Sequence, residues 1–244
     1  MNAPLAHSAY PQTWYAPLQK PLFWLALGLT FTWEALGFDG WVMSEIGTVD
    51  GFPLRHHPFL ASVMHDQLKT VLLVLFGLAW LMGLWPRGLA RDLNLRQRWT
   101  SMLGVSLCLC IVSSLKYVST TSCPWDWQAF GGLAQPIPFW RWGALDGGSG
   151  HCFPGGHASS ALAFLSIVWV AVTAESVTAQ RWGRQLLWVV LGLGALMGVV
   201  QTLRGAHPPS HTLWTAWICA AVGWACEWVS RRWFVRSRVF MARV

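Results

Sequence analysis

The stretch LLWVVLGLGALMGVVQTLR, residues 186–204, is almost entirely apolar, and its single charged residue is the last one. A helix of this length is sufficient to cross about 30 Å of hydrocarbon. Similar runs recur along the chain, and together they predict an all-α polytopic membrane protein built as a bundle of six transmembrane helices. The expected spans are approximately 21–38, 68–85, 100–117, 158–174, 186–204 and 211–229.

The composition of the chain favours the same class. Hydrophobic residues make up 54% of the 244 residues and charged residues 11%, against about 25% charged residues in soluble domains. Many of the 19 tryptophans flank the apolar runs, where the amphipathic indole suits the headgroup region. A single integral membrane domain over residues 1–244 is therefore expected, and a soluble helical core is the less favoured alternative.

The positive charges predict the topology. Arginines follow the second, fourth and sixth runs, which places those segments and both chain ends in the cytoplasm. The connections 39–67, 118–157 and 205–210 then lie together on the opposite, periplasmic side of a bacterial inner membrane. Since the net charge of +7 is spread between the runs instead of forming one basic face, the partner expected is the bilayer and not a nucleic acid.

The first outer connection contains LRHHPFLASVMHDQ, residues 54–67. Its apolar residues between His57 and His65 suggest a short amphipathic helix that lies on the membrane surface as a lid or a wall for lipid entry. An ordinary interfacial connector is the alternative for His56, His57 and His65 taken singly.

The outer connection 118–157 holds two cysteines, Cys123 and Cys152. Because the periplasm is oxidising, we expect a disulfide between them. Free thiols and metal ligands are the alternatives.

Three stretches border the outer face and together offer the groups that phosphate chemistry needs. Lys116 and Arg204 supply positive charge for phosphate oxygens. His157 can act as the acid and His207 as the nucleophile. The stretches are KYVSTTSCPWD from Lys116, CFPGGHASS from Cys152 and LRGAHPPSHTLW from Leu203.

Two glycines precede His157. Pro154, Gly155 and Gly156 predict a tight turn whose unshielded amides, with the N-terminus of the following helix, form a cradle for an anion. A plain turn between a loop and a helix is the alternative for the Gly-Gly pair alone.

These stretches resemble the three signature motifs of the type 2 phosphatidic acid phosphatase superfamily, K-x6-R-P, P-S-G-H and S-R-x5-H-x3-D. The resemblance extends from about Lys116 to Trp217. It implies a membrane lipid phosphatase in which His207 forms a phosphohistidine and His157 donates a proton, without a metal or other cofactor. The implied substrates are phosphorylated membrane lipids: undecaprenyl pyrophosphate, phosphatidylglycerophosphate, phosphatidic acid or a lipid A phosphate.

Several positions depart from these motifs, four of them at residues considered for the site. Cys123 stands at an arginine position, Gly155 at a serine, Gln201 at an arginine and His211 at an aspartate. We expect Arg204, three residues after Gln201 and on nearly the same helix face, to supply the missing guanidinium.

Other residues of the expected outer side are candidates to support His207 or to bind the phosphate. His211 and Asp126 are candidates to support His207, with Asp146 as a second carboxylate. Arg141 lies in the same outer loop as Cys123 and is a candidate to supply the positive charge that is missing at the Cys123 position.

Three other functions stay open. The first is a metallohydrolase, the second a catalytically degenerate protein that binds a phosphorylated lipid or scaffolds a partner, and the third a lipid phosphotransferase. The possible metal ligands are His151, His157, His207, His211, Asp126 and Asp146; the positive charge of Lys116 and Arg204 disfavours a cation there.

Overall fold

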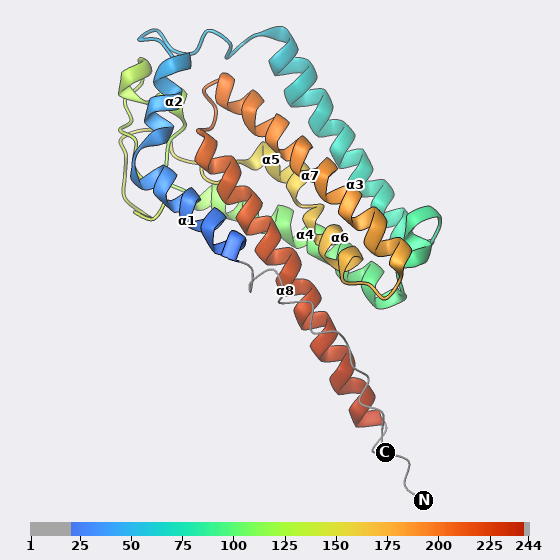
Figure 1. Cartoon of the computed structure of the whole chain (residues 1–244). Helices are drawn as coiled ribbons and strands as arrows, with labels where there is room; N and C mark the ends of the chain where they lie inside the picture. Colours follow the sequence, from blue (N-terminus) through green and yellow to red (C-terminus); the bar gives the residue numbers. More distant parts are fainter. Residues whose placement is uncertain (1–20, 242–244) are drawn as a thin grey trace, which may run out of the picture.

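The computed structural model describes residues 21–241, with side chains as far as Trp233, and within this range it is all-helical (Figure 1). The α-helices are α1 (Pro21–Ala35), α2 (Phe38–Ile46), α3 (Leu68–Leu84), α4 (Leu95–Val118), α5 (Gly156–Leu162), α6 (Leu165–Val172), α7 (Val177–Leu203) and α8 (Pro209–Met241). A π-helix, η2 (Phe59–Gln67), precedes α3, and three 3-10 turns are η3 (Gly88–Asp92), η4 (Pro124–Asp126) and η5 (Gln128–Phe130).

The broken helix formed by α5 and α6 lies at the centre of the bundle and packs against α4, α7 and α8. The main hydrophobic core is contributed by these same helices and includes Val105, Leu162, Val190 and Cys219. In Figure 1, α1 and α3 lie on opposite sides of this group, and α8 continues well beyond it. The central group therefore positions the outer ends of four helices relative to one another.

Small residues allow the central helices to approach closely. A Cβ atom on Gly194 of α7 would lie 2.5 Å from the side chain of Leu162, and one on Gly104 of α4 would lie 2.9 Å from Ser166. Close backbone approach at small residues is typical of helices packed within a membrane, where dispersion contacts drive association.

Three helical segments are long and apolar enough to cross a membrane: 59–84, 95–118 and 177–203. A fourth results if α1 and α2, which are bent by 65° at the break between them, are counted as one span. These helices indicate a membrane protein. The expected six spans match the order of the helices, but α5 and α6 together are short and α8 is not among the candidates by length and hydropathy.

The first expected span differs from the structure. It was predicted to run to residue 38, but α1 ends at Ala35, and the chain turns through Gly37, whose φ is 71°, into α2. Glu34 stabilises this bend because it accepts hydrogen bonds from the Trp214 indole at 2.6 Å and from the Phe139 amide at 2.8 Å. Long-range polar contacts of this kind are not visible in a hydropathy pattern.

The predicted surface helix around residues 57–65 is also corrected. The segment forms η2, which continues into α3 without a break, because Gln67 and Leu68 both keep helical backbone angles. We call residues 59–84 the arm. Within it only Leu72 is buried, so the arm lies at the edge of the bundle.

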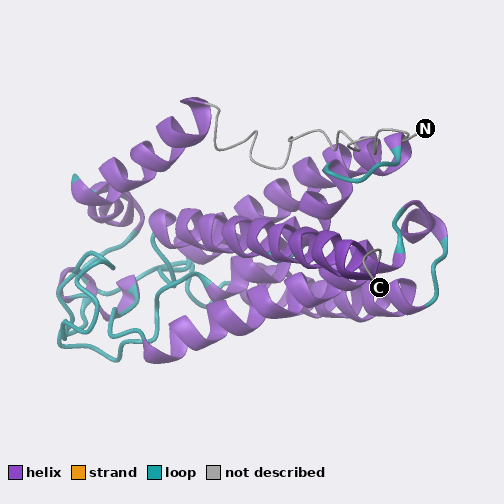
Figure 2. Ribbon diagram, turned by 90° about the horizontal axis from the view of Figure 1, so that it is seen from below, coloured by secondary structure: helices purple, strands orange, loops and turns teal. Residues whose placement is uncertain are grey.

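The two ends of the bundle differ in character. Most of the loops gather at one end (Figure 2), where Met43, Phe52, Trp127 and Phe130 form a small core of their own. Towards the other end, Glu227 of α8 is buried and accepts hydrogen bonds from Arg96 at 3.0 Å and Arg231 at 2.6 Å. A buried carboxylate requires such partners, and Arg96 thereby ties α4 to α8.

Candidate functional site

Lys116 and His207 meet at the loop-rich end of the bundle. Lys116 lies in the last turn of α4, and His207 lies in the short connection between α7 and α8. The Nζ atom of Lys116 is 3.5 Å from Nε2 of His207, which is 4% exposed. An ammonium group has only donors, so Nε2 accepts and carries the lone pair. The first and third motifs, 91 residues apart in the sequence, thus meet at the expected nucleophilic atom.

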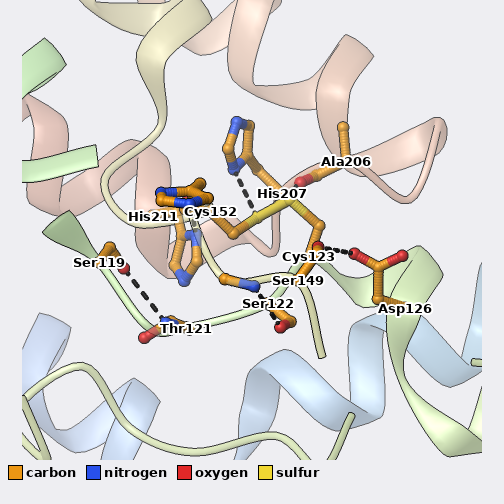
Figure 3. Close-up of a disulfide and its surroundings, with 12 residues drawn as sticks. Ser119, Thr121, Ser122, Cys123, Asp126, Ser149, Cys152, Ala206, His207 and His211 are labelled. Carbon is orange, nitrogen blue, oxygen red and sulfur yellow. Dashed lines mark hydrogen bonds between the residues drawn. A yellow bond between two sulfur atoms is a disulfide. The ribbon is translucent and has the colours of Figure 1, made fainter. Parts of the chain in front are cut away.

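The opposite nitrogen of His207 faces a disulfide (Figure 3). Cys123 and Cys152 are bonded, as the sequence predicts, with their Cα atoms 5.1 Å apart. Nδ1 of His207 lies 3.3 Å from Sγ of Cys152. Since Nε2 accepts from Lys116, Nδ1 carries the ring hydrogen, and the sulfur is its acceptor. The disulfide therefore joins the first motif to the second and also contacts the imidazole of the third.

His211 has a different partner from the one expected. Its Nδ1 donates to the backbone oxygen of Cys152 at 3.1 Å, and its ring centroid is 5.7 Å from that of His207. His211 thus holds the backbone beside the disulfide instead of orienting His207 directly. The contact of His211 with His207 is therefore indirect, because Cys152, and not His211, lies beside Nδ1.

The imidazole of His157, in the first turn of α5, packs against the arm. The His157 and His65 rings are stacked, with centroids 3.6 Å apart and planes 18° apart. Nε2 of His157 lies 3.2 Å from the backbone oxygen of His65. His157 also acts electrostatically on His207, as Lys116 does on both histidines. The two expected catalytic histidines are therefore brought to one charged region.

The surroundings of His207 and His157, the two expected catalytic histidines, keep both rings neutral at neutral pH. Burial, with a smaller effect of the Lys116 charge, holds the pKa of His207 well below its usual range. Burial and then the neighbouring His65 lower the pKa of His157 to about 4. A neutral His207 has an unprotonated Nε2 at neutral pH. His157, in contrast, gains a proton only when an anion offsets the surrounding positive charge.

The two glycines have different roles. The Gly155 amide donates to the backbone oxygen of His211 at 3.3 Å, so it is not free for an anion, and this part of the predicted cradle is corrected. A Cβ on Gly156 would lie 3.3 Å from Cδ of Lys116. The absence of a side chain at Gly156 thus lets the Lys116 side chain lie against the start of α5.

The expected carboxylates lie elsewhere. Asp126 accepts a hydrogen bond from Ser149 at 2.9 Å (Figure 3). Asp146 is buried and accepts from the amide and hydroxyl of Ser122. In the described part of the chain, neither is recorded in contact with His207, because the turns of the outer loop use both carboxylates for their own hydrogen bonds.

The metal-ligand set suggested by the sequence is not brought together. His151 is exposed and contacts the backbone oxygen of Lys116. Within residues 21–241, the group that lies close enough to share an ion is Cys123, Cys152 and His207. Its two sulfurs are bonded to each other and therefore offer no thiolate ligand.

A protein-family model, that of the PAP2 superfamily, matches residues 99–234. This match covers more than half of the chain and contains all three motifs. The chain belongs to the PAP2 superfamily. No curated protein and no solved structure matches it. Membership in the PAP2 superfamily indicates phosphatase-type activity on phosphorylated substrates.

The structure accounts for two departures from the PAP2 motifs together. Cys123, at an arginine position, is bonded to Cys152, and His211, at an aspartate position, donates to the Cys152 backbone. Both substituted residues therefore act on Cys152. Its sulfur is the neighbour of Nδ1 of His207.

The third departure leaves a buried amide. Gln201 is 3% exposed, and its Nε2 has no hydrogen-bond partner, while its backbone oxygen accepts from the amides of Ala206 and His207. Arg204 ends α7 and donates from Nε to the backbone oxygen of Arg55 at 3.1 Å. Among the described residues, no hydrogen bond from its NH1 or NH2 group accompanies this contact.

Two residues of the arm were not predicted as part of this PAP2 site. His65 was considered only as part of a lid, and Lys69 was not considered. Lys69 stands four residues after His65, hence on the same helix face, and its charge acts on His157 and Lys116. In the sequence, the spacing H-x3-K indicates that His65 and Lys69 share one face of the arm.

Proposed function

We propose that this protein is a membrane lipid phosphatase that hydrolyses a phosphomonoester or pyrophosphate at the outer face of a bacterial inner membrane. The observation that carries the proposal is the contact between Lys116 and Nε2 of the buried His207. It combines a neutral imidazole lone pair with a cation that can bind the phosphate under attack. Both groups belong to motifs of the family to which the chain belongs.

In the first step, Nε2 of His207 attacks phosphorus, and the bond from phosphorus to the lipid or leaving phosphate oxygen breaks. His157 gives its proton to the departing oxygen. In the second step, water attacks the phosphorus of the phosphohistidine, the P–N bond breaks, and His157 takes a proton from the water. Arg204 and Lys116 bind the equatorial oxygens throughout.

The bound phosphate also prepares the acid. Burial, and then the charges of its neighbours, keep His157 neutral at neutral pH. A phosphate dianion among Lys116, Arg204 and Lys69 offsets these charges and raises the pKa of His157. The proton donor is thus charged when substrate is present.

The neighbour of Nδ1 distinguishes this site from the family pattern. An aspartate would hold the histidine tautomer with a charged acceptor, whereas here the acceptor is the sulfur of Cys152. The sulfur fixes the ring without adding negative charge. Positioning alone is a large part of catalysis when the reacting atoms are held in line.

The test is phosphate release by the purified full chain from a panel of phosphorylated lipids, with and without EDTA. The panel contains undecaprenyl pyrophosphate, phosphatidylglycerophosphate, phosphatidic acid and lipid A. Release that is lost in His207→Ala and survives EDTA supports the proposal and names the substrate. Release that EDTA abolishes would instead support a metallohydrolase.

Two further outcomes distinguish the remaining alternatives. Absence of release from every lipid would support a degenerate binding protein, which the four motif departures keep open. Transfer of ³²P from a labelled lipid to a second lipid, instead of to water, would support the phosphotransferase. His57→Ala is the control, since His57 is exposed and lies outside the motifs.

A further inference from the structure

His65 contacts His157 in two ways. The imidazole rings stack with centroids 3.6 Å apart, and the backbone oxygen of His65 lies 3.2 Å from Nε2 of His157. A carbonyl oxygen only accepts, so Nε2 of His157 carries a hydrogen and donates it. The lone pair of the neutral ring then lies on Nδ1, which becomes the nitrogen that exchanges a proton.

The His65 ring is itself held in place. Its Nδ1 lies 2.6 Å from Oδ1 of Asp66, and a carboxylate oxygen accepts. Nδ1 of His65 therefore carries the hydrogen. Asp66, His65 and His157 form a chain of contacts that runs from the surface to the proposed acid.

The face of the arm that carries His65 and Lys69 lies towards His157. Lys69 follows His65 by one helical turn, and its charge acts on His65 and His157. In the described part of the chain, Lys69 forms no ion pair. A cation without an acidic partner beside two histidines and Lys116 fits a region that receives an anion.

The segment that carries His65 is unusual in its backbone. Nine residues of η2 are π-helical, and π-helical turns are frequently found at functional sites. None of these residues is buried, so a hydrophobic core does not explain the position of His65. Its most extensive recorded contact is the stack with His157.

We propose that His65 is a positioning residue for His157, and that its ring and backbone oxygen fix the plane and the tautomer of the proton donor. This inference rests on the proposed phosphatase function. It adds to the active site a residue that lies outside all three motifs, 92 residues before His157.

The experiment compares two variants of the full-length protein in detergent micelles, with release of phosphate from the lipid that the wild type hydrolyses. His65→Ala removes the ring, and His65→Phe keeps a ring of similar shape, while both keep the backbone oxygen. We expect His65→Ala to lower kcat by at least about tenfold with KM within about twofold, because misplacement of the acid affects the chemical step. His65→Phe should restore most of kcat.

His57→Ala is the matched control, because His57 is an exposed histidine a few residues earlier in the chain. If His65→Ala does not fold, as judged by gel filtration and Tm, His65→Asn takes its place, since it also lacks the ring.

Three results would overturn the inference while the phosphatase function stands: a kcat of His65→Ala equal to that of His57→Ala, an equal loss in His65→Phe and His65→Ala, or a rise in KM alone. A wild type that releases no phosphate from any lipid would overturn the phosphatase function first, and this inference with it.

Discussion

The loop of residues 119–155 is closed by a disulfide and contributes Trp127 and Phe130 to a small hydrophobic core, whereas the arm has one buried residue, Leu72. Both segments reach the catalytic region. The loop contacts His207 through Cys152, and the arm contacts His157 through His65. The segment closed by the disulfide therefore contacts the proposed nucleophile, and the loosely packed one contacts the proposed proton donor.

This difference agrees with what each histidine must do. The nucleophile has to be held in line with phosphorus, which a covalent closure achieves. In the proposed mechanism the acid meets the lipid headgroup, and a peripheral helix with few buried contacts is able to move at low cost. The following predictions test this contrast, beginning with the largest effect.

Removal of the disulfide tests the rigid side. Cys123→Ala and Cys152→Ala each open a loop whose ends are 29 residues apart, which should cost about 3–4 kcal/mol of stability. Both variants should therefore unfold at similarly lower temperatures in thermal denaturation.

Activity should separate the same two variants. Cys123→Ala keeps the sulfur beside Nδ1 of His207, whereas Cys152→Ala removes it. We expect kcat of Cys152→Ala to be lower by about threefold or more, in line with the loss of one hydrogen bond. Equal rates of phosphate release would show that the disulfide acts only through loop closure.

Core packing should distinguish the central helices from the arm. Leu162 of α5 is 2% exposed, and Leu75 of α3 is 45% exposed. Leu162→Ala should cost about 2–5 kcal/mol, while Leu75→Ala should stay within about 0.5 kcal/mol. Denaturation of the two variants in the same detergent measures this, and equal losses would mean that the arm is packed as tightly as the core.

Arg204 stands at the end of α7, and its Nε donates to the backbone oxygen of Arg55, shortly before the arm. Arg204→Gln should raise KM or lower kcat by at least about tenfold, because a charge-assisted phosphate contact contributes about 1.5–3 kcal/mol. Arg204→Lys, which keeps the charge, should lose less. Unchanged steady-state kinetics in Arg204→Gln would show that it does not replace the guanidinium missing at Gln201.

The pH dependence of stability tests the buried histidines of both regions. Burial lowers the pKa of His207 and His157 in the folded protein, whereas an unfolded histidine binds a proton below about pH 6.5. The unfolded state then binds more protons, so the free energy of unfolding should fall as the pH drops through about 6.5 towards 4. In thermal scans from pH 7.5 to 5, His207→Gln and His157→Gln should flatten this dependence, and the exposed His57→Gln should leave it unchanged.

Much of this molecule follows from local sequence. Runs such as residues 186–204 have to be helical and apolar-facing because an unpaired backbone is too costly in hydrocarbon. Lys116, His157 and His207 stand at motif positions. The presence of two cysteines in the same connection between helices was enough to predict the disulfide between them. These features depend on residue type and spacing, which the sequence contains in full.

The tertiary structure alone decided which polar atoms meet. Nothing in the sequence indicates that His65 stacks on His157, that His211 donates to the backbone of Cys152, or that the Gly155 amide is already used. These contacts join segments tens of residues apart, and each depends on how neighbouring helices pack. Hydropathy determines that a helix is buried in a membrane, but the angle and rotation that aim its end residues come from packing against the other helices.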